Sequence, residues 1–99
     1  MLYETNDWNK VKKDPEAVVA FTASWCQPCQ QLKPQFARAS VQDVERNYYI
    51  VDIDEVNIND VESFKIRGIP KIFVTSNGDG VKEISGRTAR DIVKQVTGE

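Results

Sequence analysis

The chain has 99 residues with a formal net charge of −2, and 40% of its residues are hydrophobic. That length suits a single domain, which we expect to span residues 1–99, and the small negative charge gives no argument for nucleic acid or an anionic membrane as a partner. The sequence contains no histidine, so a Ser–His or Cys–His dyad is excluded and the commonest metal ligand is missing.

The N-terminal part of the chain is predicted to form a short helix followed by a buried strand. Residues 4–13 (ETNDWNKVKK) favour a helix, which Asn6 or Asp7 is able to cap. Residues 2–4 are a candidate for a short preceding strand. Residues 17–22 (AVVAFT) are almost continuously apolar and largely β-branched, which is typical of a strand buried on both faces.

A helix is predicted over residues 26–46. Its apolar side chains recur at a spacing that places them on one buried stripe, formed by Leu32, Phe36, Ala39 and Val44. Pro34 falls inside this helix and removes one backbone hydrogen bond, so we expect a kink there.

The second half of the chain is also predicted to contain both strands and helices. Strands are predicted at residues 48–53, 71–75 and 81–85, and helices at residues 57–67 and 88–98. The Asn-Gly and Asp-Gly pairs within residues 76–80 tolerate positive φ, so the strands on either side should form a hairpin. This order predicts an α/β fold with a central mixed sheet of four to five strands and helices on both faces.

The two cysteines of the chain are three positions apart, at the junction of a strand and a helix. Cys26 opens the predicted helix, where unpaired backbone N–H groups and the helix dipole favour a thiolate. Cys29 lies on the same helical face within disulfide reach, and Pro28 is tolerated in the first turn. This geometry suits an outer nucleophilic thiol and an inner thiol that resolves a mixed disulfide.

Three other interpretations of the cysteine pair remain open. A structural zinc site needs about four ligands, and this chain supplies two cysteines without histidine. A purely structural disulfide would close a very short loop, worth roughly 2 kcal/mol at best. The cysteines are otherwise two inert core residues. A C-x-x-C motif at a strand-to-helix junction in a β-α-β pattern favours redox chemistry over all three.

The sequence resembles the thioredoxin family over nearly its whole length. The segments that carry the resemblance are VVAFTASWCQPCQQLKP, YYIVDIDE and FKIRGIPKIFVTSNG, with the Trp-Cys-x-Pro-Cys box, the helix proline and the Gly-Ile-Pro turn as the most specific parts. The resemblance implies the thioredoxin fold and thiol–disulfide exchange, with Cys26 as the nucleophile and Cys29 as the resolving thiol.

The resemblance also implies a substrate-binding surface around the cysteines. Trp25 would pack beside the site, and Ile69–Pro70 would be a cis peptide that faces the disulfide and presents backbone groups to a substrate chain, as if adding a strand. Gly86 resembles the glycine that flanks the same groove in the family, although a simple helix-entry turn explains it nearly as well.

The expected activity is that of a protein disulfide reductase in electron transport and cell redox homeostasis. The resemblance implies that protein disulfides are its substrates and that electrons come from thioredoxin reductase or the glutathione system. We expect no metal or bound cofactor, since the Cys26–Cys29 dithiol carries the electrons. The N-terminal residues lack the basic-then-apolar order of a secretory signal, so we expect a cytoplasmic protein, and a monomer.

Three features depart from the family pattern. Gln27 replaces the usual glycine of the box and, with Pro28, is expected to tune the redox potential. Ala20 stands where the family has a buried aspartate, and Ile50 stands near the matching lysine. Without that carboxylate we expect slower resolution by Cys29. The two glutamines after the box, at 30–31, should weaken the positive potential around Cys26.

Two alternative functions are retained. A glutaredoxin served by glutathione is disfavoured by Gly-Ile-Pro in place of a Thr-Val-Pro turn, and by the lack of a clear Gly-Gly pair before the last helix. A thioredoxin-fold binding subunit with incidental redox activity is the other alternative, and a Cys26→Ser variant separates it from an enzyme.

Overall fold

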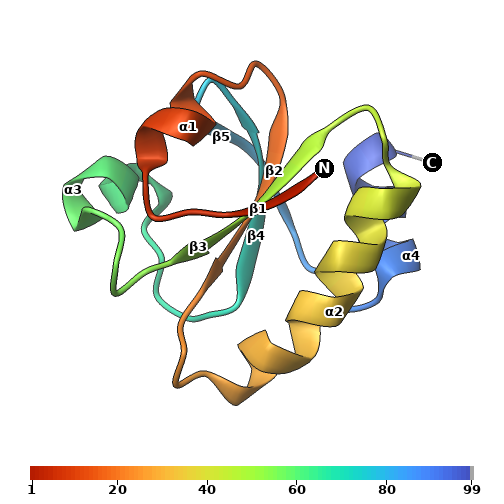
Figure 1. The fold of residues 1–99 in the computed structure, drawn as a ribbon, viewed down its shortest axis with the longest axis horizontal. Coiled ribbons are helices and arrows are strands. Elements are labelled where there is room, and N and C mark those ends of the chain that lie inside the picture. The colour runs from red at the N-terminus through yellow and green to blue at the C-terminus, as the bar shows by residue number, and fades with distance from the viewer. Residues whose placement is uncertain (99) are drawn as a thin grey trace.

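The computed structural model describes residues 1–98 as a five-stranded sheet covered by helices on both faces (Figure 1). The strands are β1 (Leu2–Glu4), β2 (Ala17–Thr22), β3 (Asn47–Asp52), β4 (Lys71–Ser76) and β5 (Asp79–Ile84). The helices are α1 (Trp8–Lys12), α2 (Gln27–Gln42), α3 (Ile58–Val61) and α4 (Ala89–Thr97), with a 3₁₀ turn η1 (Glu62–Phe64) directly after α3. The strand order is β1-β3-β2-β4-β5. The α/β fold with a mixed sheet is therefore confirmed.

The sheet combines parallel and antiparallel pairs. Strands β1 and β2 both run parallel to β3, while β4 is antiparallel to β2 and β5 is antiparallel to β4. Parallel strands need a crossover, and α2 supplies it between β2 and β3. Because β2 is central, all six of its residues are buried, as its continuous apolar composition predicts.

Two hydrophobic cores lie on the two faces of the sheet. Val18 and Ala20 of β2 pack on the face covered by α2 and α4, whereas Val19 and Phe21 pack on the face covered by α1 and α3 (Figure 1). This division follows from the alternation of side chains along a strand. On the second face Trp8 stacks on Phe21, with their ring centroids 5.8 Å apart, and anchors α1 to the core.

The longest helix ends earlier than its sequence pattern predicts. α2 stops at Gln42, and Asp43 is its C-cap, so the expectation of a helix to residue 46 is wrong. Val44, which we expected on the buried stripe, is 81% exposed, while Leu32, Phe36 and Ala39 are buried as predicted. Among residues 1–98, no helix has both the length and the hydrophobicity needed to cross a bilayer.

The helix predicted at residues 57–67 is also shorter in the structure. Asn57 caps a single turn, α3, which tightens into η1 and ends at Lys65 with φ of 51°. The hairpin is confirmed: β4 and β5 flank Asn77 and Gly78, both with positive φ. Thr88 accepts a hydrogen bond from the Asp91 N–H and begins α4, and Asp7 caps α1 in the same way.

The hydroxyl of the buried residue Tyr49 should make the folded protein less stable at high pH. Its hydroxyl donates to Asp14 Oδ2 at 3.0 Å, and burial, followed by that hydrogen bond and the charge of Asp14, raises the pKa of Tyr49 to about 12. The unfolded chain loses this proton near pH 10 while the folded chain keeps it. The contribution of Tyr49 to the free energy of unfolding therefore falls by about 1.4 kcal/mol per pH unit between pH 10 and 12.

The matched variant for this prediction is Tyr49→Phe. It should lower the free energy of unfolding by about 1 kcal/mol at pH 8, where the hydrogen bond is intact. Above pH 10 the difference from the parent should shrink, vanish near pH 11 and reverse toward pH 12, because only the parent loses stability through Tyr49. Urea unfolding at pH 8, 10 and 11 measures both proteins. A difference that stays constant across this range would contradict the prediction.

Candidate active site

The two cysteines form a disulfide at the start of α2. Cys26 is the N-cap of the helix, and its Sγ accepts a hydrogen bond from the Cys29 backbone N–H at 3.2 Å. The two Cα atoms are 5.2 Å apart. Cys26 is 5% exposed and Cys29 is fully buried. The helix N-terminus is therefore aimed at the outer sulfur, where its N–H groups stabilise a negative charge.

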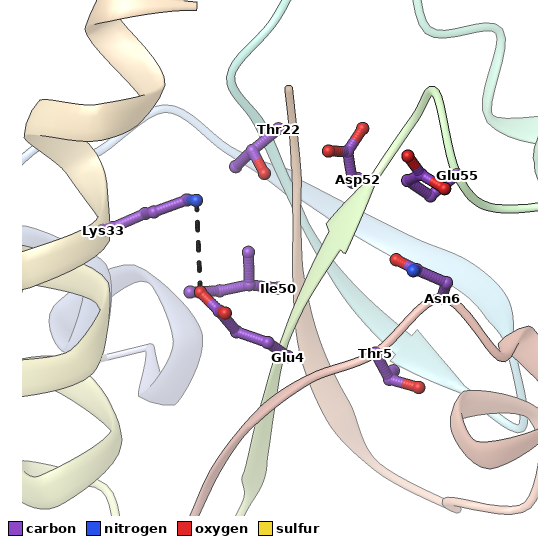
Figure 2. Close-up of a pocket in the computed structure, with 8 residues that line it drawn as sticks. All are labelled: Glu4, Thr5, Asn6, Thr22, Lys33, Ile50, Asp52 and Glu55. Atoms are coloured by element: carbon purple, nitrogen blue, oxygen red, sulfur yellow. Dashed lines mark ion pairs between the residues drawn. The ribbon is translucent and has the colours of Figure 1, made fainter. Parts of the chain in front are cut away.

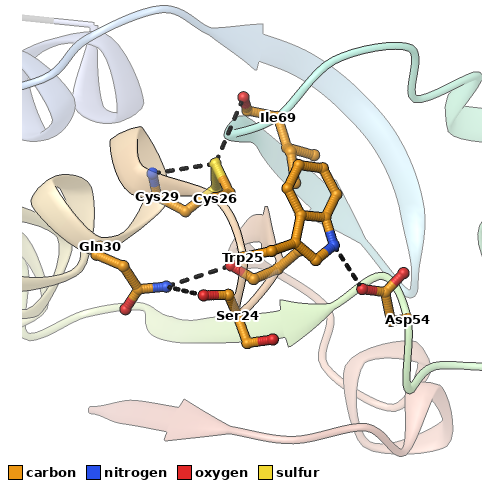
Figure 3. Close-up of a disulfide and its surroundings, with 8 residues drawn as sticks. Ser24, Trp25, Cys26, Cys29, Gln30, Asp54 and Ile69 are labelled. Atoms are coloured by element: carbon orange, nitrogen blue, oxygen red, sulfur yellow. Dashed lines mark hydrogen bonds between the residues drawn. A yellow bond between two sulfur atoms is a disulfide. The ribbon is translucent and has the colours of Figure 1, made fainter.

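A cis peptide lies against the outer sulfur, as the sequence resemblance implies. The Ile69–Pro70 bond is cis, and Cys26 Sγ lies 3.8 Å from the Ile69 carbonyl oxygen (Figure 3). In the disulfide this sulfur carries no hydrogen, so the contact becomes a hydrogen bond only when Cys26 is a thiol. The structure thus brings three predicted site residues, Cys26, Ile69 and Pro70, into one place.

Trp25 is the exposed wall of the site. Its side chain is 67% exposed, and its Nε1 donates to Asp54 Oδ2 at 2.8 Å (Figure 3). A shallow cavity of about 320 Å³ runs beside it, between Trp25 and the segment Ile66–Ile69, with Ile53 as a further wall. This cavity, lined mainly by apolar side chains, borders Ile69 of the cis turn.

Sequence reasoning missed Asp54 as a partner of Trp25. The two residues are 29 positions apart, but each follows the carboxyl end of one of two neighbouring parallel strands, β2 and β3. Such ends meet at the same edge of a sheet. The topology of the predicted β-α-β unit was therefore the signal that would have placed Asp54 at the site.

Gln30 has a role that the sequence did not suggest. Its Nε2 donates to the backbone oxygens of Ala23 and Ser24, at 3.2 and 3.5 Å (Figure 3). These bonds tie the first turn of α2 to the loop that carries Trp25 and Cys26. Gln27 and Pro28 occupy the exposed surface of the same turn.

Three further positions singled out in the sequence, Gly86, Ala20 and Ile50, are explained by packing. A Cβ on Gly86 would come within 3.0 Å of Asp91 Cβ and 3.1 Å of Ile92 N, so close packing against the start of α4 explains this glycine. Ala20 and Ile50 are paired across β2 and β3 and are 1% and 5% exposed. The interior beside the site is therefore apolar at these two positions.

The chemistry of the site depends on sulfur. Within residues 1–98, the side chains of Cys, Asp and Glu form no group of three or more that could hold a metal ion. A sulfur at a helix N-terminus, on a residue that is 5% exposed and is bonded to a fully buried cysteine, is suited to reversible exchange with another disulfide.

Three comparisons with known proteins agree with this geometry. The thioredoxin family model matches residues 2–98. Thioredoxin H3 of Arabidopsis thaliana is 29% identical over 96 residues, which cover 92% of this chain and 80% of that protein. Thioredoxin-3 of Dictyostelium discoideum is 35% identical over 78 residues, covering 79% and 74%. The oxidised thioredoxin from Plasmodium falciparum superposes with a TM-score of 0.81 at 22% identity, over 99% of this chain and 97% of that one.

Proposed function

The chain belongs to the thioredoxin family, and from this premise we propose that it reduces disulfide bonds in other proteins. Its membership and its Cys26–Cys29 disulfide make it a thiol–disulfide oxidoreductase. The single observation that carries this proposal is the placement of Cys26. Its sulfur lies at a helix N-terminus, beside the Ile69 carbonyl and an exposed tryptophan.

In the proposed cycle the two cysteines have different roles. The thiolate of Cys26 attacks one sulfur of a substrate disulfide and forms a mixed disulfide, and the first substrate thiol leaves. Cys29, which is buried one helical turn inside the outer sulfur, then attacks Cys26 Sγ and releases the second substrate thiol. The helix N-terminus stabilises Cys26 both as nucleophile and as leaving group, because either role places negative charge on that sulfur.

The surface around Cys26 supports binding of an extended substrate segment. Pro70 is buried and holds the turn, so the Ile69 backbone is available to an incoming strand at the site. Trp25, fixed by Asp54, forms the apolar wall of the adjoining cavity. In this proposal Gln27 and Pro28 tune the potential, and Gly86 shapes the far side of the groove through its packing on α4.

The proposal extends to the electron donor, the oligomeric state and the cellular compartment of the protein. Thioredoxin reductase is the proposed electron donor, with the glutathione system as the alternative, and the domain of residues 1–99 acts as a monomer in the cytoplasm without a bound cofactor. There it takes part in electron transport and cell redox homeostasis. Its curated relatives named as thioredoxins support the reductase as donor.

Insulin reduction tests the proposed function. We expect the protein to precipitate insulin B chains when thioredoxin reductase and NADPH supply electrons, because an exposed disulfide reaches Cys26 directly. The same assay with glutathione and glutathione reductase is the comparison, and activity restricted to glutathione would favour the glutaredoxin-like alternative. Inactivity with both donors would contradict a reductase and favour a binding subunit.

A further inference from the structure

A polar cleft opens between α2 and the parallel part of the sheet (Figure 2). Its volume is about 560 Å³. Glu4 and Glu55 at its rim are exposed, whereas Thr22 and Ile50 at its floor are only 2% and 5% exposed. A polar cleft of this size, open at its rim, has room for several water molecules.

The strand register explains why this cleft lies under α2. Glu4, Ile50 and Ala20 are register partners across β1, β3 and β2, and Thr22 pairs with Asp52 in the row that is two residues further along. Register partners in parallel strands point to the same face of the sheet. Ala20 and Ile50 pack against α2, so the row that contains Thr22 and Asp52 faces the helix as well.

Two short links join this cleft to the buried resolving cysteine. Lys33 lines the cleft and follows Cys29 by four residues in α2, so both side chains lie on one face of the helix. Ala23 packs in a cluster with Cys26 and Cys29, and it follows directly on Thr22 at the floor. The cleft therefore begins about one helical turn from Cys29.

The charges around the cleft are unequal. Lys33 is the one cation among the described residues that line it, and Glu4, Asp52 and Glu55 are anions. Lys33 Nζ lies 4.0 Å from Glu4 Oε1, and its side chain is 31% exposed. A partly buried ammonium acts on a neighbouring charge more strongly than an exposed one does. Without Lys33, every charged side chain that lines the cleft would be a carboxylate.

We propose that Lys33 promotes the resolving step by stabilising the thiolate of Cys29 through this water-accessible cleft. The inference rests on the proposed function. In the mixed disulfide, the Cys29 thiol releases its proton to water in the cleft. Its thiolate then attacks Cys26 Sγ, the Cys26–Cys29 bond forms, and the bond between Cys26 and the substrate sulfur breaks. The substrate leaves as a thiolate and takes a proton from solvent, so no further oxidant or reductant is needed.

Lys33 is an electrostatic positioning residue in this scheme, because it acts on Cys29 without touching the reacting sulfur atoms. Its effect should therefore appear in one half of the reaction only. The attack by Cys26 depends on the helix N-terminus, whereas the attack by Cys29 depends on the charge of the cleft. A defect in general structure would slow both halves.

Stopped-flow reaction of the reduced protein with equimolar 5,5′-dithiobis(2-nitrobenzoate) separates the two halves. Each attack releases one coloured nitrothiobenzoate anion, the first from Cys26 in a bimolecular phase and the second from Cys29 in a phase independent of reagent concentration. In Lys33→Met we expect the second phase at pH 7 to slow roughly three- to tenfold, with its pH profile displaced upward and the first phase unchanged. Lys33→Arg, which keeps the charge, should retain the parent rate.

The matched control is Lys10→Met, which removes the same charge from the exposed surface of α1 and should leave both phases unaltered. If Lys33→Met folds poorly by circular dichroism, Lys33→Gln replaces it in the same measurement. A second phase that is unchanged in the Lys33 variant, or slowed equally by Lys10→Met, would overturn the inference. Loss of the first phase in the parent protein would instead contradict the proposed function.

Discussion

Replacing Cys26 by serine should lower the rate of insulin reduction by about three orders of magnitude or more. The serine hydroxyl stays protonated at neutral pH, so the helix N-terminus has no thiolate to stabilise. Replacing Cys29 by serine should have a different result. The nucleophile remains, but the mixed disulfide with substrate has no internal thiol to break it, so the reaction stops halfway.

Trapping separates the two roles directly. Cys29→Ser incubated with a disulfide substrate should accumulate a covalent adduct, visible by intact mass and on a non-reducing gel, and dithiothreitol should release it. The Cys26→Ser protein, whose remaining sulfur is buried in the structure, should form little adduct, and the double variant none. An adduct that forms as fast on Cys26→Ser as on Cys29→Ser would reverse the assignment of the two thiols.

Replacing Asp43 by alanine should lower the free energy of unfolding by about 3 kcal/mol. The carboxylate is 3% exposed. It accepts a hydrogen bond from the Tyr48 hydroxyl at 2.9 Å and two from Arg46 Nη1 at 3.2 Å. Removing it leaves a buried hydroxyl without this partner and leaves Arg46 with Glu16 as its remaining ion pair. For a domain of ordinary stability, roughly 5–15 kcal/mol, this is a large share.

Chemical denaturation at neutral pH measures this loss as a lower midpoint. Asp43→Asn keeps an oxygen acceptor for Tyr48 and should lose less than Asp43→Ala. Glu45→Ala removes a neighbouring carboxylate that is exposed, and its effect should stay within about 0.5 kcal/mol. Equal destabilisation by Asp43→Ala and Glu45→Ala would show that the buried cluster contributes little.

The parts of the fold that the sequence predicts well are those fixed by local patterns. β2 has the predicted bounds because its residues are almost continuously apolar and lie on both buried faces, and α4 begins after Thr88, the first residue of the predicted helix. The sequence pattern extends α2 too far because Val44 continues the apolar spacing, whereas Asp43 caps the helix and turns a buried carboxylate toward Arg46 and Tyr48. Apolar periodicity alone carries no information about a polar cluster that ends a helix in this way.

Some features of the candidate site could be predicted from the sequence, and others depend on how the strands pair. The sequence predicts where Cys26 and Cys29 lie, and the family resemblance supplies the cis peptide at Ile69–Pro70. The cleft with Lys33 was not predicted, since it depends on which residues of three strands are neighbours, and that register is set by long-range pairing. Its floor at Thr22 becomes apparent only when the strands are paired.

The two tryptophans give the protein separate optical reporters. Trp8 is 3% exposed inside the aromatic core, while Trp25 is 67% exposed beside the disulfide. A dissolved quencher such as acrylamide will reach the indole of Trp25 and leave that of Trp8 nearly untouched. Emission that resists quenching therefore follows unfolding, and quenchable emission follows docking of substrate at the sulfur, so one unlabelled sample distinguishes the two events.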